Sequence, residues 1–360
     1  MQIDFHHGVI YVLARLAGFE KRDADIIAYC SQYVDDATLN VPIRFLDGAL
    51  YKPLQSAHKM LDYRNFNDLA YSLVWIPFHF LPGNGNLTAS EGKELDYVKR
   101  IICRKNSPLA QDMIRDCIEK KSETTGLYRF GIALHTYADT WAHQGFAGIQ
   151  SEVNKVKYLR RNKIDEKLID KLSTFFGSNF DKAQGIFLNA ALPLGHGTVL
   201  SYPDRPYLTW SYEDHQGSEI LKNNPEIYME AVDHIYEAMK RYLIDNPYAD
   251  VEGVPSEERK KIEDYLRTID FTSGEERHRE WLKLIREGKF SFGPEYVSYA
   301  SDGRGSWEFE ITNGYDVETD IINSHKFFET SHWRYFYDAI RDHYYFLLRK
   351  LFPKYGLLIA

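Results

Sequence analysis

The chain has 360 residues, of which 44% are hydrophobic, 27% charged and 15% aromatic, a composition that fits a globular protein and excludes a disordered one. A formal net charge of −8 argues against unspecific nucleic-acid binding through a basic surface. Three cysteines, Cys30, Cys103 and Cys117, provide no disulfide framework.

The N-terminal residues, Met-Gln-Ile-Asp-Phe-His-His, lack the basic and apolar regions of a signal peptide. The longest apolar run, residues 71–81, is interrupted by Pro77 and His79. It is far shorter than the roughly 20 apolar residues that cross a bilayer. We therefore expect a cytoplasmic protein without a transmembrane segment.

Helices dominate the elements predicted along the first 245 residues. Val9–Ala17 ends at Gly18, a residue that commonly closes helices, and Asp23 can cap the next helix, Ala24–Asp36. A hairpin is expected near Asp47-Gly48. Helical patterns then recur over residues 90–104, 108–121, 125–144, 154–176, 179–191 and 224–245.

The composition of the chain changes after residue 245. Residues 246–258 contain two prolines, a glycine and several acids, which predicts a linker. We therefore expect a metal-binding helical domain at 1–245 and a helical extension at 246–360 packed against it. The extension should hold helices at 256–287 and 321–352, with short strands at 289–314. The fold class is mainly α, with minor β structure in the C-terminal third.

Three metal-ligand side chains are four residues apart in the segment Gly131–Phe146, namely His135, Asp139 and His143. Residues at this spacing share one helical face, with about 6 Å of rise per step. One ion cannot easily take all three, whereas two neighbouring ions could share Asp139. Small and apolar neighbours predict that the trio is buried, which without partners would cost several kcal/mol. Metal coordination offsets that cost.

Other histidines and acids have ordinary structural roles when each is taken alone, such as hydrogen-bonded core residues or solvated turns. Their order along the chain nevertheless resembles that of the zinc-dependent phospholipase C and single-strand-specific zinc nuclease superfamily. The most specific match is Gly-Ile-Ala-Leu-His-x3-Asp at Gly131–Asp139, and the similarity spans about residues 4–204. The chain looks most like an uncharacterised bacterial branch of that superfamily.

The resemblance implies a multi-helix domain with a cluster of two or three zinc ions between its helices. By analogy, Asp36 (or Asp35), His79, His135 and Asp139 would hold one ion. His6 (or His7) would hold a second, with Asp139 bridging. The third would take His143 and His196 with a downstream carboxylate.

The chain departs from the superfamily in three places. The secreted relatives use the amine and carbonyl of a processed N-terminal Trp, whereas this sequence starts with Met1, so either Asp4 supplies the missing donor or this ion is absent. The superfamily has a carboxylate four residues after the Gly-His histidine, where this chain has Leu200, and Asp204 is the nearest acid. The spacing from Asp139 to the next histidine, His143, is also shorter.

The resulting hypothesis is a metal-dependent phosphoesterase that uses an activated water, with Asp36 orienting or deprotonating that water. Histidine and carboxylate ligands suit zinc but also other divalent transition metals. The substrate would be a small-molecule or lipid phosphate ester. Two alternatives stay open: a catalytically silent metal-binding protein of the same fold, and a hydrolase of other bonds such as amides. Candidates for substrate contact are Arg205, Trp210 and Tyr212, although packing is the commoner role of such aromatic residues.

Overall fold

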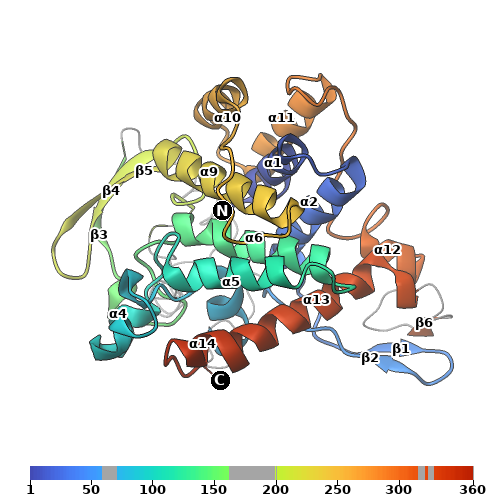
Figure 1. Ribbon diagram of the computed structural model, residues 1–360, viewed down its shortest axis with the longest axis horizontal. Coiled ribbons are helices and arrows are strands. Elements are labelled where there is room, and N and C mark those ends of the chain that lie inside the picture. Colours follow the sequence, from blue (N-terminus) through green and yellow to red (C-terminus); the bar gives the residue numbers. More distant parts are fainter. Residues whose placement is uncertain (59–70, 162–198, 200, 315–320, 323–327, 360) are drawn as a thin grey trace, which may run out of the picture.

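The computed structural model describes residues 1–58, 71–161, 199, 201–314, 321–322 and 328–359. Their fold is mainly α, as expected from the sequence (Figure 1). The α-helices are α1 (Ile10–Ala17), α2 (Lys21–Asp36), α4 (Tyr97–Ile101), α5 (Pro108–Glu119), α6 (Gly126–Ala142), α9 (Asn224–Leu243), α10 (Ser256–Thr268), α11 (Gly274–Arg286), α12 (Trp307–Thr312), α13 (His332–Phe346) and α14 (Phe352–Lys354). Among the described residues, the π-helical segments are η1 (Asp4–Val9), η3 (Tyr71–His79) and η10 (Leu347–Leu351), and short 3₁₀ turns are η4 (Asn84–Asn86), η5 (Glu91–Glu94), η6 (Glu152–Asn154) and η9 (Phe328–Thr330).

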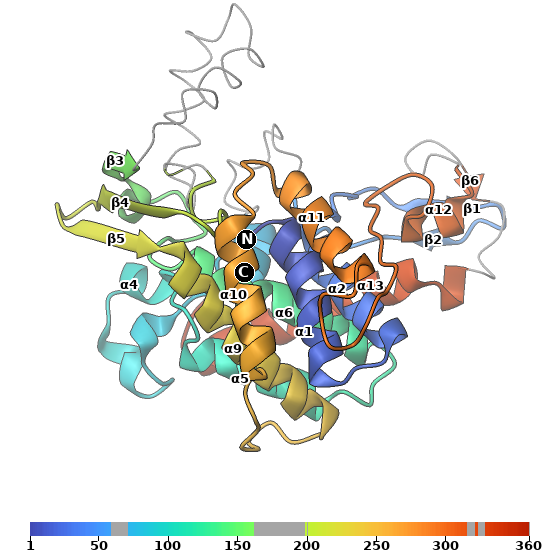
Figure 2. The ribbon, with the colours of Figure 1, turned by 90° about the horizontal axis from the view of Figure 1, so that it is seen from above.

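Two small sheets lie at opposite ends of the helical body (Figures 1 and 2). One has the order β2–β1–β6 and the other the order β3–β4–β5. Their strands are β1 (Ile43–Phe45), β2 (Leu50–Tyr51), β3 (Lys157–Arg161), β4 (Thr209–Glu213), β5 (Glu219–Asn223) and β6 (Ile321–Ile322). The antiparallel β1–β2 pair confirms the hairpin predicted at Asp47-Gly48. Among the described strands, β6 lies in the C-terminal third, where minor β structure was expected, and the other five lie earlier in the chain.

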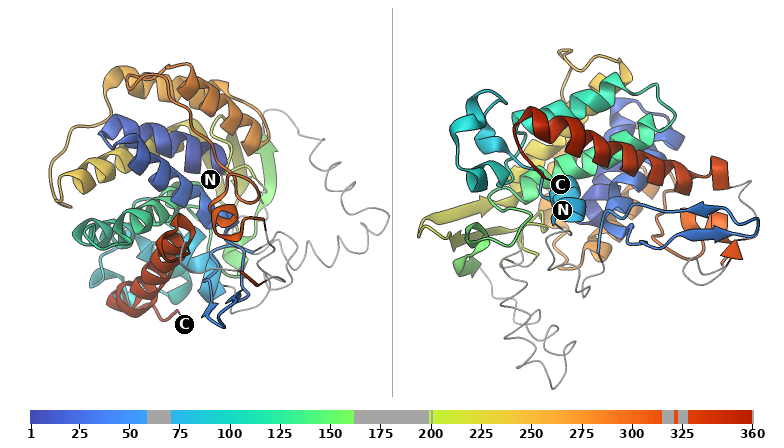
Figure 3. Two further views of the ribbon diagram at one scale, coloured as in Figure 1. Left: turned by 90° about the vertical axis from the view of Figure 1, so that its right-hand side faces the viewer. Right: turned by 90° about the horizontal axis from the view of Figure 1, so that it is seen from below.

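Helix α6 is the central element and packs against α2, α5, α9 and α13 (Figures 1 and 3). Nearly all its residues are buried. It lies close against α2 at Gly131, where a Cβ would be 2.7 Å from the Ile27 carbonyl oxygen and 2.7 Å from Cys30 Cβ. This contact brings the C-terminal end of α2 beside His135.

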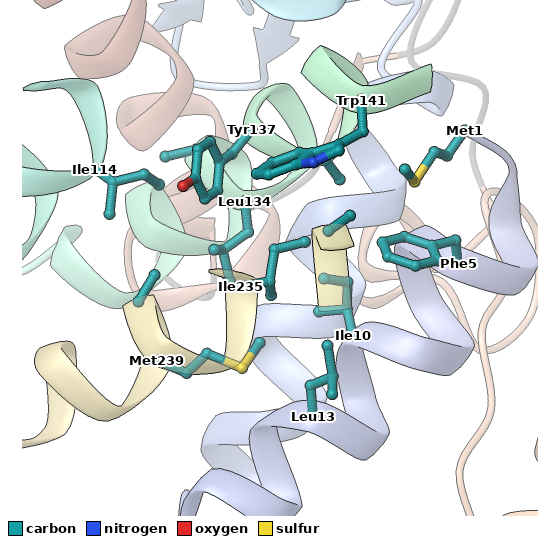
Figure 4. Packing of buried hydrophobic residues seen from close by; sticks show 14 of the residues in the cluster. Met1, Phe5, Ile10, Leu13, Ile114, Leu134, Tyr137, Trp141, Ile235 and Met239 are labelled. Atoms are coloured by element: carbon teal, nitrogen blue, oxygen red, sulfur yellow. The ribbon is translucent and has the colours of Figure 1, made fainter. Parts of the chain in front are cut away.

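One hydrophobic core joins the N-terminal and C-terminal parts of the chain. It includes Phe5 and Leu134 together with Trp281 and Leu351, all at most 2% exposed. Figure 4 shows part of this core, to which η1 contributes Phe5, α6 contributes Leu134 and α9 contributes Ile235. The predicted boundary at residue 246 falls in the largely exposed connection between α9 and α10. The described residues on both sides of it therefore share this core.

Several element boundaries differ from the sequence predictions. The helix expected at 256–287 is two helices, because the Ser273 hydroxyl accepts a hydrogen bond from the Glu276 amide and caps a new start at α11. The strands expected at 289–314 are absent from that described stretch, which instead holds α12. The helix expected from residue 154 is replaced up to residue 161 by β3, which pairs with β4.

Within the described residues, no helix combines the length and apolar character needed to cross a membrane.

Candidate metal centre

Six segments of the fold deliver nitrogen and oxygen ligands to one buried place. Helix α6 supplies His135 and Asp139, and its capping residue is His143. The remaining ligands come from the chain start, η1, the end of α2, the end of η3 and the loop before β4. They are the Met1 amine, His6, Asp35, His79 and Asp204.

Asp35 and Asp139 each place a carboxylate oxygen close to the ring nitrogens of His79 and His135. His79 Nδ1 lies 3.2 Å from His135 Nε2, and Asp35 Oδ1 lies 3.7 Å from each of them. Asp139 Oδ2 lies 3.5 Å from His79 Nδ1 and 3.4 Å from His135 Nε2. Zinc binds such ligands at about 2.0–2.1 Å, which puts tetrahedral ligand atoms about 3.4 Å apart. Five distances between ligand atoms of these residues, at 3.2–3.7 Å, are thus close to the value expected around one zinc ion.

The outer ring nitrogens of these histidines are held by backbone carbonyl groups. His135 Nδ1 donates to the Ser31 carbonyl oxygen at 2.7 Å, and His79 Nε2 donates to that of Ser56 at 2.9 Å. A carbonyl oxygen only accepts, so the proton of each neutral ring is on the outer nitrogen. The inner nitrogens then turn lone pairs toward each other and toward two carboxylates. This all-acceptor group requires a cation, and such carbonyl contacts are typical of metal-bound histidines.

The other oxygen of Asp139 faces a second group of ligands. Asp139 Oδ1 lies 2.5 Å from the Met1 amine and 3.2 Å from His6 Nε2. The amine is 3.4 Å from Asp204 Oδ1, which lies 3.8 Å from His143 Nε2. His143 Nδ1 donates to the His79 carbonyl oxygen, so the lone pair of the neutral ring is on Nε2, which faces Asp204. Asp139 thus stands between two groups of ligands, as a bridging carboxylate would.

Burial and charge set the protonation of the centre. The pKa of Asp139 lies well below its usual value, since His143, the Met1 amine, His135 and His6 outweigh the burial that would raise it. Burial lowers the pKa of His6 to about 3, so this ring is neutral. The pKa of His79 is raised, because Asp139 and Asp35 outweigh burial. The two carboxylates therefore favour the protonated form of His79 when no metal is bound.

Two predicted ligands lie outside this group. Asp4 is not a substitute donor, because Arg277 holds both its oxygens through Nε at 2.6 Å and Nη2 at 3.2 Å. Asp36 is not the α2 carboxylate at the centre, because it accepts hydrogen bonds from Tyr299 at 2.5 Å and Gln32 at 3.0 Å. Its neighbour Asp35 takes that place. Asp36 is therefore also not placed to orient or deprotonate a water at the centre, as the sequence had suggested.

Of the predicted substrate contacts, Trp210 and Tyr212 have packing roles. Trp210 donates to Asn224 Oδ1 at 3.1 Å and is 2% exposed. Tyr212 stacks on Trp210 and Phe146 in the same hydrophobic cluster. Arg205 is fully buried and donates to Ser201 Oγ at 3.0 Å. The predicted ligand His196 lies outside the described residues.

Sequence reasoning missed Arg277, which organises one side of the centre. Besides Asp4, its guanidinium donates to Gln2 Oε1 at 2.7 Å and to the Asp204 carbonyl oxygen at 3.1 Å. It thereby ties helix α11 to the segments that carry the Met1 amine, His6 and Asp204. Arg277 sits in a strongly charged helix, where one arginine looks like the others, so no signal in the sequence marked it.

Comparison with known proteins gives one assignment. Residues 1–351 match the profile of a family of unknown function, DUF6765. The chain belongs to this family. No curated protein and no solved structure matches it significantly. The family description states no activity, so the function has to be argued from the metal centre.

Proposed function

We propose that this DUF6765 protein is a metal-dependent hydrolase, a phosphoesterase that uses a cluster of two or three divalent ions, zinc foremost. The observation that supports this most is the all-acceptor group of His79, His135, Asp35 and Asp139. Mixed histidine and carboxylate ligation with a central carboxylate is the pattern of multinuclear hydrolytic sites. A cytoplasmic location stays a prediction, which cell fractionation tests.

When bound, divalent ions would lower the pKa of water and polarise a phosphoryl oxygen. The protein's own groups would orient and receive protons around that chemistry. Asp35 is the most exposed carboxylate of the centre, with 31% of its side chain accessible, so it is the one that can meet substrate and solvent. It takes the role of orienting water or accepting its proton. The proposed substrate class is a small-molecule or lipid phosphate ester.

Burial of the other ligands favours a second candidate, a metal-binding protein without catalysis. His6 and His135 are fully buried, Asp139 is 1% exposed and His143 is 5% exposed. Closed sites with every position filled by protein are typical of structural zinc, whereas catalytic zinc keeps a position open. The two candidates therefore differ in whether solvent reaches the ions past Asp35.

Metal analysis combined with a hydrolysis assay separates these candidates. The protein, purified without chelator, is analysed by plasma mass spectrometry and assayed with bis(p-nitrophenyl) phosphate. His135→Ala removes a central ligand, and His215→Ala, on an exposed turn, is the matched control. We expect two or three ions per protein molecule and hydrolysis of this diester. His135→Ala should abolish the hydrolysis, and His215→Ala should not.

The other outcomes are equally informative. Tightly bound metal without hydrolysis of this or any other ester would support the silent candidate. A protein that neither contains nor takes up divalent metal would contradict both.

A further inference from the structure

A cavity of about 840 Å³ opens beyond the C-terminal end of α6, between the β4–β5 hairpin and the segment that carries α4. Gln144 and Gly145, which follow His143, are among the residues that line it. Apolar side chains, among them Leu95 and Ile220, line one part of it. Its size falls in the range of small-molecule sites, about 300–1,000 Å³.

The most unusual group in this cavity is Lys222 of β5. The residue is 8% exposed, and its ammonium donates one hydrogen bond, to the Gln144 carbonyl oxygen at 2.9 Å. Across the part of the chain that the structure describes, no carboxylate lies within ion-pair distance of it. Burial lowers the pKa of Lys222 to about 8, and Arg104 and Lys105 add to this effect against the opposing thiol of Cys103. Buried cations are normally paired, so a counterion is missing here.

Lys99 and Arg104 also line this cavity. Neither forms an ion pair with a carboxylate among the described residues. The acids nearby do not compensate for them. Asp214 accepts hydrogen bonds from the backbone amides of its own turn, and Glu230 pairs with Lys105 at 2.5 Å. Glu226 is the one remaining acid of the lining. This local excess of positive charge stands out in a chain of net charge −8.

We propose that this cavity binds an amphipathic organic anion, whose charged head lies on Lys222 and Arg104 and whose apolar body lies against Leu95 and Ile220. The head would supply the counterion that Lys222 lacks, through charge-assisted hydrogen bonds. The apolar body would cover surface that is otherwise wet. This inference does not depend on the metal centre, because none of the metal ligands lines the cavity.

A structural role for Lys222 is the competing explanation. The Gln144 carbonyl group lies just past the end of α6, where a cation stabilises the helix dipole. That role needs Lys222 alone, and it predicts no ligand and no contribution from Arg104. Binding measurements on both residues therefore separate the two explanations.

The test is isothermal titration of the full-length, metal-loaded protein with decanesulfonate below its micellar concentration. Sulfonates are poor metal ligands, which keeps the probe away from the metal centre. We expect a single bound molecule, an affinity that falls roughly ten-fold or more in Lys222→Met, and a smaller loss in Arg104→Gln. Lys155→Met, which removes an exposed lysine paired with Glu152, is the matched control and should bind as the wild type does.

Arg104 is exposed, so Arg104→Gln keeps the test decisive even if Lys222→Met fails to fold. Decyltrimethylammonium, with the same chain and the opposite charge, should not bind. No binding of decanesulfonate, equal affinity in wild type and Arg104→Gln, or equal binding of the cationic amphiphile would overturn the proposal. So would loss of binding in His135→Ala, because that would place the probe at the metal centre.

Discussion

At the scale of single residues, neighbouring carboxylates at the end of α2 have different tasks. Asp35 lies 3.7 Å from the inner nitrogens of His79 and His135, whereas Asp36 is bound to Tyr299 and Gln32. Successive helical side chains point about 100° apart, so only one of the two can face the histidines. The sequence could predict an acid at this place but not which, because the rotation of α2 depends on its packing.

Exchange of these two acids for amides should separate metal binding from stability. Asp35→Asn removes a ligand, and we expect it to weaken zinc affinity by about ten-fold or more while the fold persists. Asp36→Asn keeps a hydrogen-bond acceptor for Tyr299 and should retain wild-type zinc affinity. Competition with a chromophoric chelator measures both. Equal zinc loss in the two variants would count against the assignment of Asp35.

His343 gives a second test at this scale. Its ring is fully buried, stacks on Phe78, and has no hydrogen-bond partner for either nitrogen in the described part of the protein. Because burial of unpaired polar groups is unfavourable, His343→Leu should raise the free energy of unfolding by about 1–2 kcal/mol in urea titrations. His332→Leu, which removes the hydrogen bond to Tyr128, should lower it. A clear loss of stability in His343→Leu would reveal a partner for this ring.

At the scale of elements, the predictable part of the fold was the set of helices with local start and stop signals. Gly18 ends α1 in the left-handed conformation, and Pro108 begins α5. The remaining elements depend on contacts between segments that are distant in the sequence. Strand β3 forms because β4 is its partner, and β6 pairs with a strand far away in sequence. The ligand spacing on α6 was also predictable, since it depends only on helical geometry.

The contact between α2 and α6 can be tested at Gly131. A Cβ there would meet the Ile27 carbonyl oxygen and Cys30 at 2.7 Å, so the two helices would have to separate. Although alanine favours helices, we expect Gly131→Ala to lower the free energy of unfolding by about 1–3 kcal/mol. It should also weaken zinc binding, because α2 carries Asp35 and the Ser31 carbonyl group. Gly253→Ala, where a Cβ has open space, is the control. Wild-type stability in Gly131→Ala would show that the helices can shift freely.

Helix α11 reaches the metal centre through Arg277. Arg277→Lys keeps a charge but cannot span Asp4, Gln2 and the Asp204 carbonyl group together. We expect this variant to lose the metal ion bound on the side of His6 and Asp204 and to keep the ion bound by His79 and His135. Its metal content should therefore fall to about one ion. Arg259→Lys, which alters the ion pair between Arg259 of α10 and Asp233 of α9, is the control. Unchanged metal content in Arg277→Lys would contradict this positioning role.

At the scale of the whole molecule, buried neutral histidines predict acid lability. Burial lowers the pKa of His6 to about 3 and that of His278 to about 4, and lowers that of His7 well below its usual value. The unfolded chain takes up these protons below about pH 6.5, whereas the folded chain does not. The neutral histidines are therefore compatible with a stable fold above that pH, and the free energy of unfolding decreases as the pH falls below it.

Each such histidine costs up to about 1.4 kcal/mol per pH unit below 6.5. His79 acts in the opposite sense, because its raised pKa stabilises the metal-free protein at low pH and this contribution is lost as the pH rises through the folded value. The destabilisation from the three histidines with lowered pKa values is expected to exceed the stabilisation from His79 at low pH. Urea unfolding of the metal-free protein should give a lower stability at about pH 5 than at about pH 7. Equal stabilities at the two pH values would contradict the neutral state of these rings.

The most direct test of the central claim is an anomalous difference map from crystals grown with zinc. The account predicts a peak at about 2.0–2.2 Å from His79 Nδ1, His135 Nε2, Asp35 and Asp139, with His135 Nδ1 still bonded to the Ser31 carbonyl oxygen. A further peak should lie on the Oδ1 side of Asp139. Crystals with no anomalous peak among these four side chains would contradict the account.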